Sequence, residues 1–285
     1  MMTARLINSL NGLADYHVHT RFSMDSEADL VAICEAAVAK GLDEIAFTDH
    51  VDFGPVDPPT SFLPSTGYLT TIETCRARWG TRLTIRAGAE IGEPHLFPEK
   101  AARILSHGDF DFFIGSAHYG VSLDPSSGIE GLQPTWHSTY FEQPLDQAYE
   151  AYFQQILALA KTGDFDVLGH VDLIKRDARE FGHPYDGPEP YADLIRAALR
   201  AVVERGKGIE INTSPLARGQ PEPCPSLDIL RWYRELGGEI LTLGSDAHRP
   251  EAVGTYFDVA LEMARAAGFT RLARFERRQI KWTEI

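Results

Sequence analysis

Seven short apolar runs along the chain each end in histidine, acidic or small polar residues, and this pattern constrains the fold more than any other feature. The run ends are DYHVHT (Asp15–Thr20), FTDH (Phe47–His50), AGAEI (Ala87–Ile91), GSAHY (Gly115–Tyr119), LGHVD (Leu168–Asp172), EINTS (Glu210–Ser214) and GSDAH (Gly244–His248). In an α/β barrel all strands point the same way, so their carboxyl ends meet on one face, where catalytic groups gather. The pattern predicts a cluster of imidazoles and carboxylates, as in a multinuclear metal site.

Strand and helix patterns alternate from Leu13 to about Gly268. A helix is predicted at Ser26–Lys40, with Ser26 as its N-cap and Gly41 as its stop. Further helices are predicted at Tyr68–Trp79, Glu99–Ser106, Leu145–Lys161, Pro190–Arg205, Ser226–Leu236 and Glu251–Ala267, and further strands at Glu44–His50, Leu83–Ile91, Asp111–His118, Asp166–Val171, Gly208–Thr213 and Glu239–Ser245. Such alternation is typical of parallel strands joined by right-handed crossovers.

Two α/β architectures fit this alternation. A doubly wound open sheet gathers its ligand near one switch point and uses fewer strand ends. Functional residues at all seven ends instead favour a single distorted (β/α)7 barrel, which is TIM-like with parallel strands. The length of 285 residues suits one barrel domain over residues 1–285, because such barrels commonly have about 250 residues.

Two longer loops, Gly120–Pro144 and Asp177–Pro190, follow strand ends and are expected on the site face. Their glycine, proline and aromatic content suits lids or substrate walls. Plain surface insertions explain the same composition equally well.

The composition excludes several classes of protein. A formal net charge of −14 argues against a nucleic-acid or anionic-membrane binder, which would show a basic surface. The N-terminus lacks a secretory signal pattern, and no stretch approaches the roughly 20 apolar residues that cross a bilayer. Three scattered cysteines, Cys34, Cys75 and Cys224, make no disulfide framework and are expected as buried thiols. We expect a cytoplasmic protein, and the sequence leaves its oligomeric state open.

The histidines are concentrated at the predicted strand ends. His17 and His19 alternate around Val18, so both imidazoles point to one side and could form half a metal shell. An exposed polar strand end is the alternative for this pair alone. Six of the ten histidines fall at strand ends, where chance placement would put about one. They are His17, His19, His50, His118, His170 and His248.

Acidic residues complete the candidate shell. Glu90 follows two small residues, and a buried carboxylate there is costly unless it binds a cation, so it could bridge two metals. Asp246 and His248 repeat the alternating geometry on the last strand, where an aspartate could ligate a metal and shuttle a proton. Asp25 is either a ligand or a helix cap.

Basic residues near the strand ends are candidates for substrate binding. Lys175, Arg176 and Arg218 are predicted in loops on the site face. Arginine suits phosphate because its planar fork binds two oxygens at once. Solvated surface residues are the alternative for all three.

The motifs, taken in order, resemble the PHP superfamily, named for polymerase and histidinol phosphatase, and more narrowly the monofunctional histidinol-phosphate phosphatases. The matching motifs are D-x-H-x-H-T at Asp15–Thr20, T-D-H at Thr48–His50, G-x-E at Gly88–Glu90, G-S-x-H-Y at Gly115–Tyr119, G-H-x-D at Gly169–Asp172 and G-S-D-A-H at Gly244–His248. Members of this family are distorted seven-stranded barrels with a trinuclear metal cluster.

The resemblance implies three divalent metal ions, each with its own set of ligands. The sets are His17, His19, Glu90 and Asp246 for the first metal, Glu90, His118 and His170 for the second, and Asp25, His50 and His248 for the third. Zinc, manganese and iron all accept such mixed nitrogen and oxygen ligation.

The resemblance also implies a reaction, the hydrolysis of L-histidinol phosphate by a metal-bridging hydroxide. Glu90, Asp246 and His248 are the expected catalytic residues, and Asp246 or a water that it orients would protonate the leaving alkoxide. Arg218, with Lys175 or Arg176, would hold the phosphate.

Other functions remain open at this point. The enzyme could act on another small phosphoester, such as a nucleotide or sugar phosphate. An amidohydrolase also opens with H-x-H, but that family commonly uses a modified lysine where this chain has Glu90. A protein that only stores metal is the alternative outside enzymes.

Overall fold

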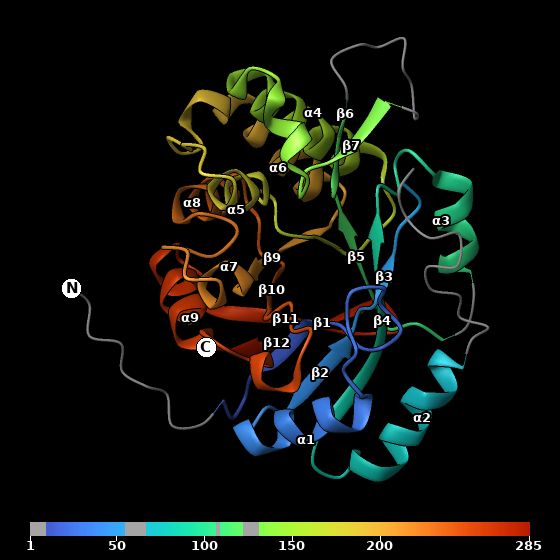
Figure 1. The fold of residues 1–285 in the computed structure, drawn as a ribbon. Coiled ribbons are helices and arrows are strands. Elements are labelled where there is room, and N and C mark those ends of the chain that lie inside the picture. The colour runs from blue at the N-terminus through green and yellow to red at the C-terminus, as the bar shows by residue number, and fades with distance from the viewer. Residues whose placement is uncertain (1–9, 55–66, 107–108, 122–130) are drawn as a thin grey trace.

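Seven parallel strands form the wall of a nearly closed barrel in the computed structural model, which describes residues 10–54, 67–106, 109–121 and 131–285 (Figure 1). Their order is β1 (Ala14–Val18), β2 (Glu44–Phe47), β4 (Thr84–Gly92), β5 (Phe112–Ser116), β8 (Val167–Leu168), β9 (Gly208–Asn212) and β10 (Leu241–Gly244). The predicted (β/α)7 barrel is therefore confirmed.

The barrel approaches closure where β1 meets the end of β10. The backbone N–H of Asp246 donates to the carbonyl of His17 at 2.8 Å, and that of His19 donates to Ala247 at 2.8 Å. The buried Asp15 carboxylate accepts the backbone N–H of Ser245 at 2.9 Å. These contacts bring the first motif, Asp15–Thr20, next to the last one, Gly244–His248.

The predicted strand Glu44–His50 is wrong as one element, because β2 ends at Phe47 and β3 (His50–Val51) is separate. Between them, the Thr48 hydroxyl accepts the backbone N–H of Val18 at 3.0 Å. Among the described strands, the short β3 pairs with β4, and its register puts His50 opposite Glu90.

Helices surround the barrel. They are α1 (Leu30–Lys40), α2 (Tyr68–Trp79), α3 (Pro98–Leu105), α4 (Leu145–Thr162), α5 (Ile174–Glu180), α6 (Ala192–Glu204), α7 (Ser214–Ala217), α8 (Leu227–Glu235) and α9 (Phe257–Ala266), with 3-10 turns η3 (Ser138–Glu142), η4 (Glu189–Tyr191) and η5 (Pro250–Ala252). Helix α2 has the predicted bounds, and the predicted stop of α1 is confirmed by Gly41, whose φ of 79° is left-handed.

Two predicted helix starts are wrong. Helix α1 begins at Leu30 because Asp29 is its N-cap and accepts the backbone N–H of Val31 at 2.8 Å. Ser26 instead donates its hydroxyl to the carbonyl of His248 at 3.0 Å. The predicted helix Glu251–Ala267 begins only at Phe257, since left-handed residues, Gly254 and Tyr256, interrupt it.

Two antiparallel hairpins and two short helices were not predicted. The hairpin of β6 (Tyr119–Val121) and β7 (Leu132–Pro134) lies within the first long loop, of which residues 122–130 lie outside the described part. The hairpin of β11 (Arg271–Glu276) and β12 (Gln279–Glu284) follows the last helix. Because of α5, Lys175 and Arg176 are helical rather than in a loop, and Arg218 directly follows α7.

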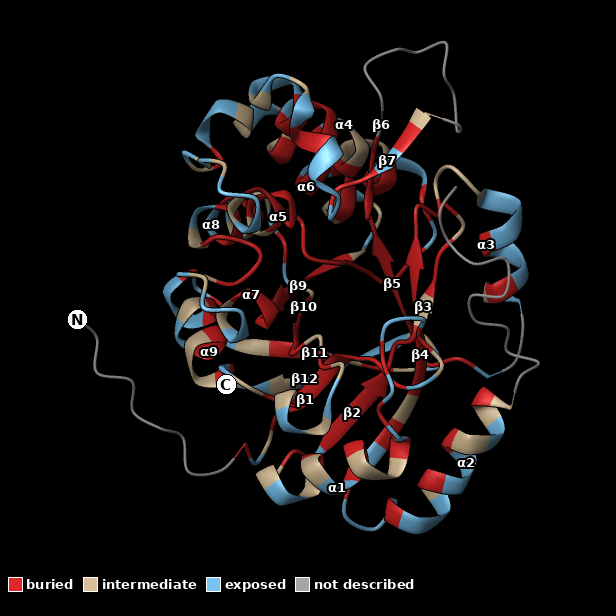
Figure 2. Ribbon diagram, viewed as in Figure 1, coloured by how far each residue is buried: buried red, intermediate tan, exposed pale blue. Residues whose placement is uncertain are grey.

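The apolar core has two layers, and the buried residues concentrate on the strands and the inner faces of the helices (Figure 2). The larger layer joins the barrel to its helices and contains two of the three free, buried cysteines, as predicted for thiols of this kind. The smaller layer fills the barrel. There, Phe275 of β11 packs against Tyr16 and Phe112, so the β11–β12 hairpin plugs the barrel end opposite the site.

Among the described residues, the structure contains no helix with the length and apolar character that a membrane crossing requires.

Candidate metal centre

The carboxyl ends of the strands surround a cavity of about 410 Å³. The predicted ligands that line it are Asp25, His50, Glu90, His118, His170, Asp246 and His248. His17 and His19 lie beneath this lining and are fully buried. The structure thus brings all nine predicted metal-competent residues together.

Glu90 lies at the centre of this group and is 1% exposed. Its Oε1 is 2.9 Å from His170 Nε2 and 3.2 Å from His118 Nε2. Its Oε2 is 3.2 Å from His17 Nε2 and 3.1 Å from His50 Nδ1. Burial alone would raise the pKa of Glu90, but the imidazoles outweigh it and hold that pKa well below its usual range. The two oxygens of one carboxylate therefore face two different sets of imidazoles.

Asp246 occupies a second position beside His17 and His19. Its Oδ1 lies 3.2 Å from His19 Nε2 and 3.7 Å from His17 Nε2. The residue has a φ of 53°, a left-handed conformation that aspartate tolerates better than most residues. The Ser214 hydroxyl donates to the other oxygen at 2.9 Å. Asp246 is therefore held in place while one oxygen stays toward the imidazoles.

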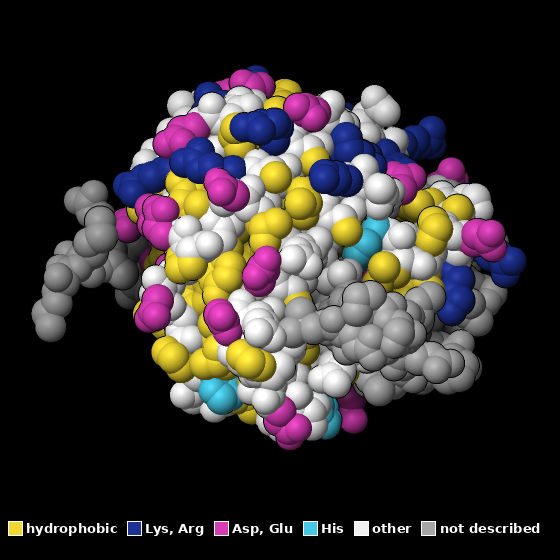
Figure 3. All heavy atoms as spheres, turned by 90° about the horizontal axis from the view of Figure 1, so that it is seen from above, with side chains coloured by type: hydrophobic (Ala, Val, Ile, Leu, Met, Phe, Trp, Pro, Cys, Tyr) yellow, Lys and Arg dark blue, Asp and Glu magenta, His cyan; other side chains and the backbone are white. Residues whose placement is uncertain are grey.

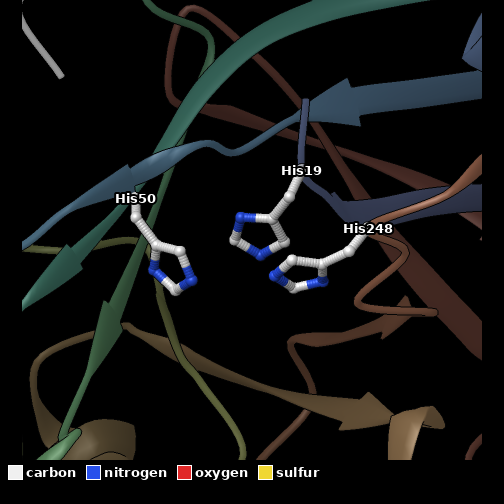
Figure 4. A group of neighbouring side chains, drawn as sticks. All are labelled: His19, His50 and His248. Atoms are coloured by element: carbon white, nitrogen blue, oxygen red, sulfur yellow. The ribbon is translucent and has the colours of Figure 1, made fainter. Parts of the chain in front are cut away.

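A third group consists of His19, His50 and His248, whose rings face one another from separate strand ends (Figure 4). The ring centroids of His19 lie 4.3 Å from those of His50 and 4.2 Å from those of His248. Asp25 adds a carboxylate oxygen 3.0 Å from His248 Nε2 and 3.6 Å from His50 Nε2. Burial and the neighbouring imidazoles lower the pKa of His19 to about 3. Its ring is therefore uncharged near neutral pH and can offer a nitrogen lone pair to a metal ion.

Several buried polar atoms at the centre of this site have no hydrogen-bond partner among the residues that the structure describes. They are His17 Nε2, His19 Nε2, His50 Nδ1 and Glu90 Oε2. Buried polar atoms without partners are rare, and bound ions are one standard explanation. Four sets of ligand atoms here each lie within 4.8 Å of one another: His19, His50 and His248; His17, His19 and Asp246; His50, Glu90 and His118; and Asp52, Glu93 and His118. The donor set therefore fits divalent cations.

Carboxylates outside the predicted set orient the histidines. Glu210 accepts a hydrogen bond from His17 Nδ1 at 2.9 Å and from the backbone N–H of His170 at 2.9 Å. Asp52, which the sequence analysis did not single out, lies beside His50 and His118. Its signal in the sequence is its spacing, two residues after His50. Such contacts fix which nitrogen of an imidazole is free to bind a metal.

The three predicted phosphate-binding residues divide into two kinds. Arg176 and Arg218 line the cavity. Lys175 does not line it: its Nζ is fully buried, 2.9 Å from Asp172 Oδ2 and 2.7 Å from the carbonyl of Pro223. The predicted position of Lys175 on the site face is wrong because this buried acid captures the ammonium group.

The remaining wall of the cavity comes partly from the two long loops. Trp136 and Glu180 line it, and Arg218 pairs with Glu180 at 3.1 Å. The two segments predicted as long loops therefore contribute to the cavity wall as far as the structure describes them, although Glu180 is the last residue of α5. Figure 3 shows the molecule from above, where basic side chains gather along one side of the face and a histidine side chain lies near its middle.

The chain is similar to named proteins over nearly its whole length. A probable histidinol-phosphatase of Clostridium acetobutylicum is 31% identical over 274 residues, which cover 94% of this chain and 98% of that protein. The histidinol-phosphatase of Lactococcus lactis subsp. lactis is 29% identical over 268 residues, covering 92% of this chain and 93% of that protein.

A solved structure has the same fold. It is the crystal structure of the histidinol phosphate phosphatase from Lactococcus lactis subsp. lactis complexed with zinc, L-histidinol and phosphate. Its TM-score is 0.78 at 26% identity, and the match covers 95% of this chain and 99% of that one.

The family comparison covers most of the motifs. Residues 15–214 match the family model described as PHP domain. This match spans more than half of the chain, and the histidines and acids that carry the motifs meet in one barrel mouth. The protein therefore belongs to the PHP domain family.

Proposed function

We propose that this protein is a histidinol-phosphatase, which hydrolyses L-histidinol phosphate to L-histidinol and phosphate in histidine biosynthesis. The observation that carries the proposal is a cavity in which histidines and acids surround Glu90 while two arginines line its wall. Relatives that align over nearly their whole length carry the same name, and the related crystal structure contains both reaction products.

The centre would hold three divalent ions of zinc, manganese or iron. The first set of ligands is His17, His19, Glu90 and Asp246, the second is Glu90, His118 and His170, and the third is Asp25, His50 and His248. Bound ions of this kind supply Lewis acidity and lower the pKa of coordinated water toward about 7. Zinc is the metal in the related structure.

The two arginines would bind the phosphate group. The guanidinium of Arg176 is fixed by Asp177, whose Oδ1 lies 2.9 Å from Nε. Asp177 is itself held by the Thr135 hydroxyl, which donates to Oδ2 at 2.7 Å. An arginine held in this way presents its remaining N–H groups to phosphate oxygens without losing further side-chain freedom. Arg218 lies on the same cavity wall.

Asp246 would move the proton during the reaction. Its carboxylate lines the cavity and is anchored on one side by Ser214, as described above. It can accept a proton from the attacking water and return it to the leaving oxygen of histidinol. His248 lies beside it, with Nδ1 3.6 Å from Asp246 Oδ1.

The functional domain would extend beyond the matched range to residues 1–285. Asp246 and His248 lie after residue 214, where the family match ends, yet they complete the site. The β11–β12 hairpin also belongs to the barrel, since it closes the opposite end.

A substrate panel tests the proposal. Purified protein loaded with zinc or manganese is assayed with histidinol phosphate, sugar phosphates, nucleotides and p-nitrophenyl phosphate. We expect histidinol phosphate to be preferred at least tenfold in kcat/KM, about 1.4 kcal/mol of transition-state binding. Equal rates across the panel would point to a phosphoesterase with another substrate, and metal uptake without any turnover would point to a binding protein.

A further inference from the structure

Asp52 lies between two imidazoles that belong to different sets of proposed ligands. Its Oδ1 is 3.0 Å from His118 Nδ1, and its Oδ2 is 3.2 Å from His50 Nδ1. The carboxylate is 5% exposed, so water competes little for either contact. One buried side chain thus contacts His118 of the second set and His50 of the third.

At His118 the contact with Asp52 is a hydrogen bond through Nδ1, and it decides which nitrogen of that ring stays free. An imidazole that donates its Nδ1 proton to a carboxylate keeps Nε2 as the metal-binding atom. The Nε2 atom of His118 faces Glu90 Oε1 at 3.2 Å, and that of His50 faces Asp25 Oδ2 at 3.6 Å. Both rings therefore point Nε2 at a carboxylate of their own set.

At His50 the Asp52 carboxylate acts through its charge, because Oδ2 lies near Nδ1 without accepting a hydrogen bond from it. His50 Nδ1 lies 3.1 Å from Glu90 Oε2, as close as it lies to Asp52. By distance, His50 fits both the group with His19 and His248 and the group with Glu90 and His118. A carboxylate beside Nδ1 favours the tautomer that carries its proton there, which leaves Nε2 of this ring for the former group.

The fold leaves a space for this carboxylate. A Cβ atom at Gly92 would lie 2.0 Å from Asp52 Oδ1 and 3.4 Å from His118 Nδ1. Gly92 ends β4 without a left-handed φ, so alanine is compatible with the backbone there. The glycine is therefore required by the position of Asp52 rather than by the strand.

We propose that Asp52 is a positioning residue that bridges His50 and His118 and makes two of the three metal positions load together. The inference rests on the proposed metal centre. It predicts that disturbing this one carboxylate weakens the positions of His50 and His118 and spares the position of His17, His19 and Asp246.

Two variants disturb the bridge in different ways. Asp52→Asn keeps the shape but offers an amide N–H to one of the two rings, and Gly92→Ala displaces an intact Asp52. Asp172→Asn is the matched control, because Asp172 is buried and follows His170 by two residues, as Asp52 follows His50. Its carboxylate pairs with Lys175 and with the backbone N–H of Ser226 instead of with an imidazole.

Zinc binding to the metal-free proteins is measured by competition with a chelator of known affinity, and the histidine tautomers are read from the nitrogen NMR shifts of the imidazoles. We expect Asp52→Asn and Gly92→Ala each to weaken two zinc equivalents together by about 10–100-fold and the remaining one by less than about twofold. The His50 and His118 rings should lose their uniform Nδ1–H form in Asp52→Asn. The control should bind zinc as the wild type does.

Wild-type affinity in both variants, or equal weakening at all three positions, would overturn the bridging role while leaving the metal centre intact. Weakening of a single position would overturn the coupling. The unfolding temperature of each metal-free variant separates a damaged fold from a selective effect. If the unfolding temperature falls equally in all variants and zinc binding weakens at all positions, Asp52 has a merely structural role. A wild-type protein that binds no zinc would instead refute the proposed function itself.

Discussion

Glu90 is the residue on which the largest number of contacts in the site depends. Each of its two oxygens lies within 3.2 Å of two imidazole nitrogens, and the side chain is almost fully buried. Such a carboxylate can stay ionised in the interior only when positive charge faces it. Its function therefore depends on charge as well as on shape.

Replacing Glu90 with glutamine tests this dependence. The amide has the same size but no negative charge, so we expect kcat to fall about a thousandfold or more and the zinc content to fall below the wild-type level. Activity and metal analysis of the purified protein check both. The matched control is Glu44→Gln, a buried glutamate at the opposite barrel end that pairs with Arg86 at 2.9 Å. Metal loss in both variants alike would argue against a specific role.

The two arginines of the cavity are expected to recognise phosphate by their planar fork. In Arg176→Lys and Arg218→Lys the charge stays but the paired N–H groups are lost, so kcat/KM should fall about 10–100-fold and inhibition by inorganic phosphate should weaken. The control is Arg179→Lys on the same helix as Arg176, because Arg179 is not part of the cavity lining. Unchanged kinetics in both cavity variants would remove the arginines from the substrate site.

At this scale, the sequence indicated the metal-competent residues better than the residues around them. The alternation of side chains along a strand and the motifs at the strand ends marked His17, His19 and Asp246 directly. Lys175 was misplaced, and Asp52 was missed, because a lone basic or acidic residue carries no periodic signal. Its role depends on which buried partner the fold sets beside it.

Among the secondary-structure elements, the β11–β12 hairpin is the one that the alternating pattern did not predict and that the barrel needs. The ring of Phe275 lies 4.9 Å from that of Phe112 and 6.0 Å from that of Tyr16, inside the barrel. Arg274 from the same strand reaches the buried Glu44 at 3.3 Å. The hairpin thus seals the end of the barrel opposite the cavity.

Removing the aromatic side chain that fills the barrel end should lower the stability of the protein without changing its catalytic rate. We expect Phe275→Ala to lower the free energy of unfolding by about 3–5 kcal/mol, because it leaves a cavity inside the barrel. Trp282→Ala in the same hairpin should cost about 0.5 kcal/mol, since that ring is 38% exposed. Urea unfolding gives both values, and kcat below the transition should match the wild type. Equal losses in the two variants would contradict the plug.

Short helices escaped the sequence analysis for a physical reason. Helices α5 and α7 have 7 and 4 residues, which is about one or two turns and too few to show a helical period. They form because neighbouring strand ends fix them, as where the buried Asp177 of α5 accepts the Thr135 hydroxyl. The long helices have several turns of apolar spacing. Most of their ends lie within a few residues of the predicted ends.

For the whole molecule, the metal centre and the net charge of −14 are linked. The acids of the site converge in a small volume, and divalent ions would neutralise part of their repulsion. An ion that binds only the folded state stabilises it by about 4 kcal/mol at a thousandfold excess over its Kd. The bound ions would therefore belong to the stability of the molecule as well as to its chemistry.

Chelation should reveal this link. We expect protein stripped of metal to keep its helical circular dichroism but to unfold at a lower temperature, because the apolar layers do not depend on the ions. Adding zinc or manganese should restore the unfolding temperature in a concentration-dependent way. Calorimetric scans with and without metal measure the shift, and identical scans would mean that the ions contribute nothing to stability.

The sequence by itself determined the barrel and the identity of the metal-competent residues. Apolar strand runs, the helical spacing of apolar residues and the motifs at the strand ends are all local signals, so they can be read without the fold. Only the tertiary structure decided which atoms face one another. Contacts such as those of Asp52 with His50 and His118, or of Phe275 with Tyr16, join residues far apart in the chain. They arise from the closure of the barrel, which places distant strand ends at one mouth and the last hairpin at the other.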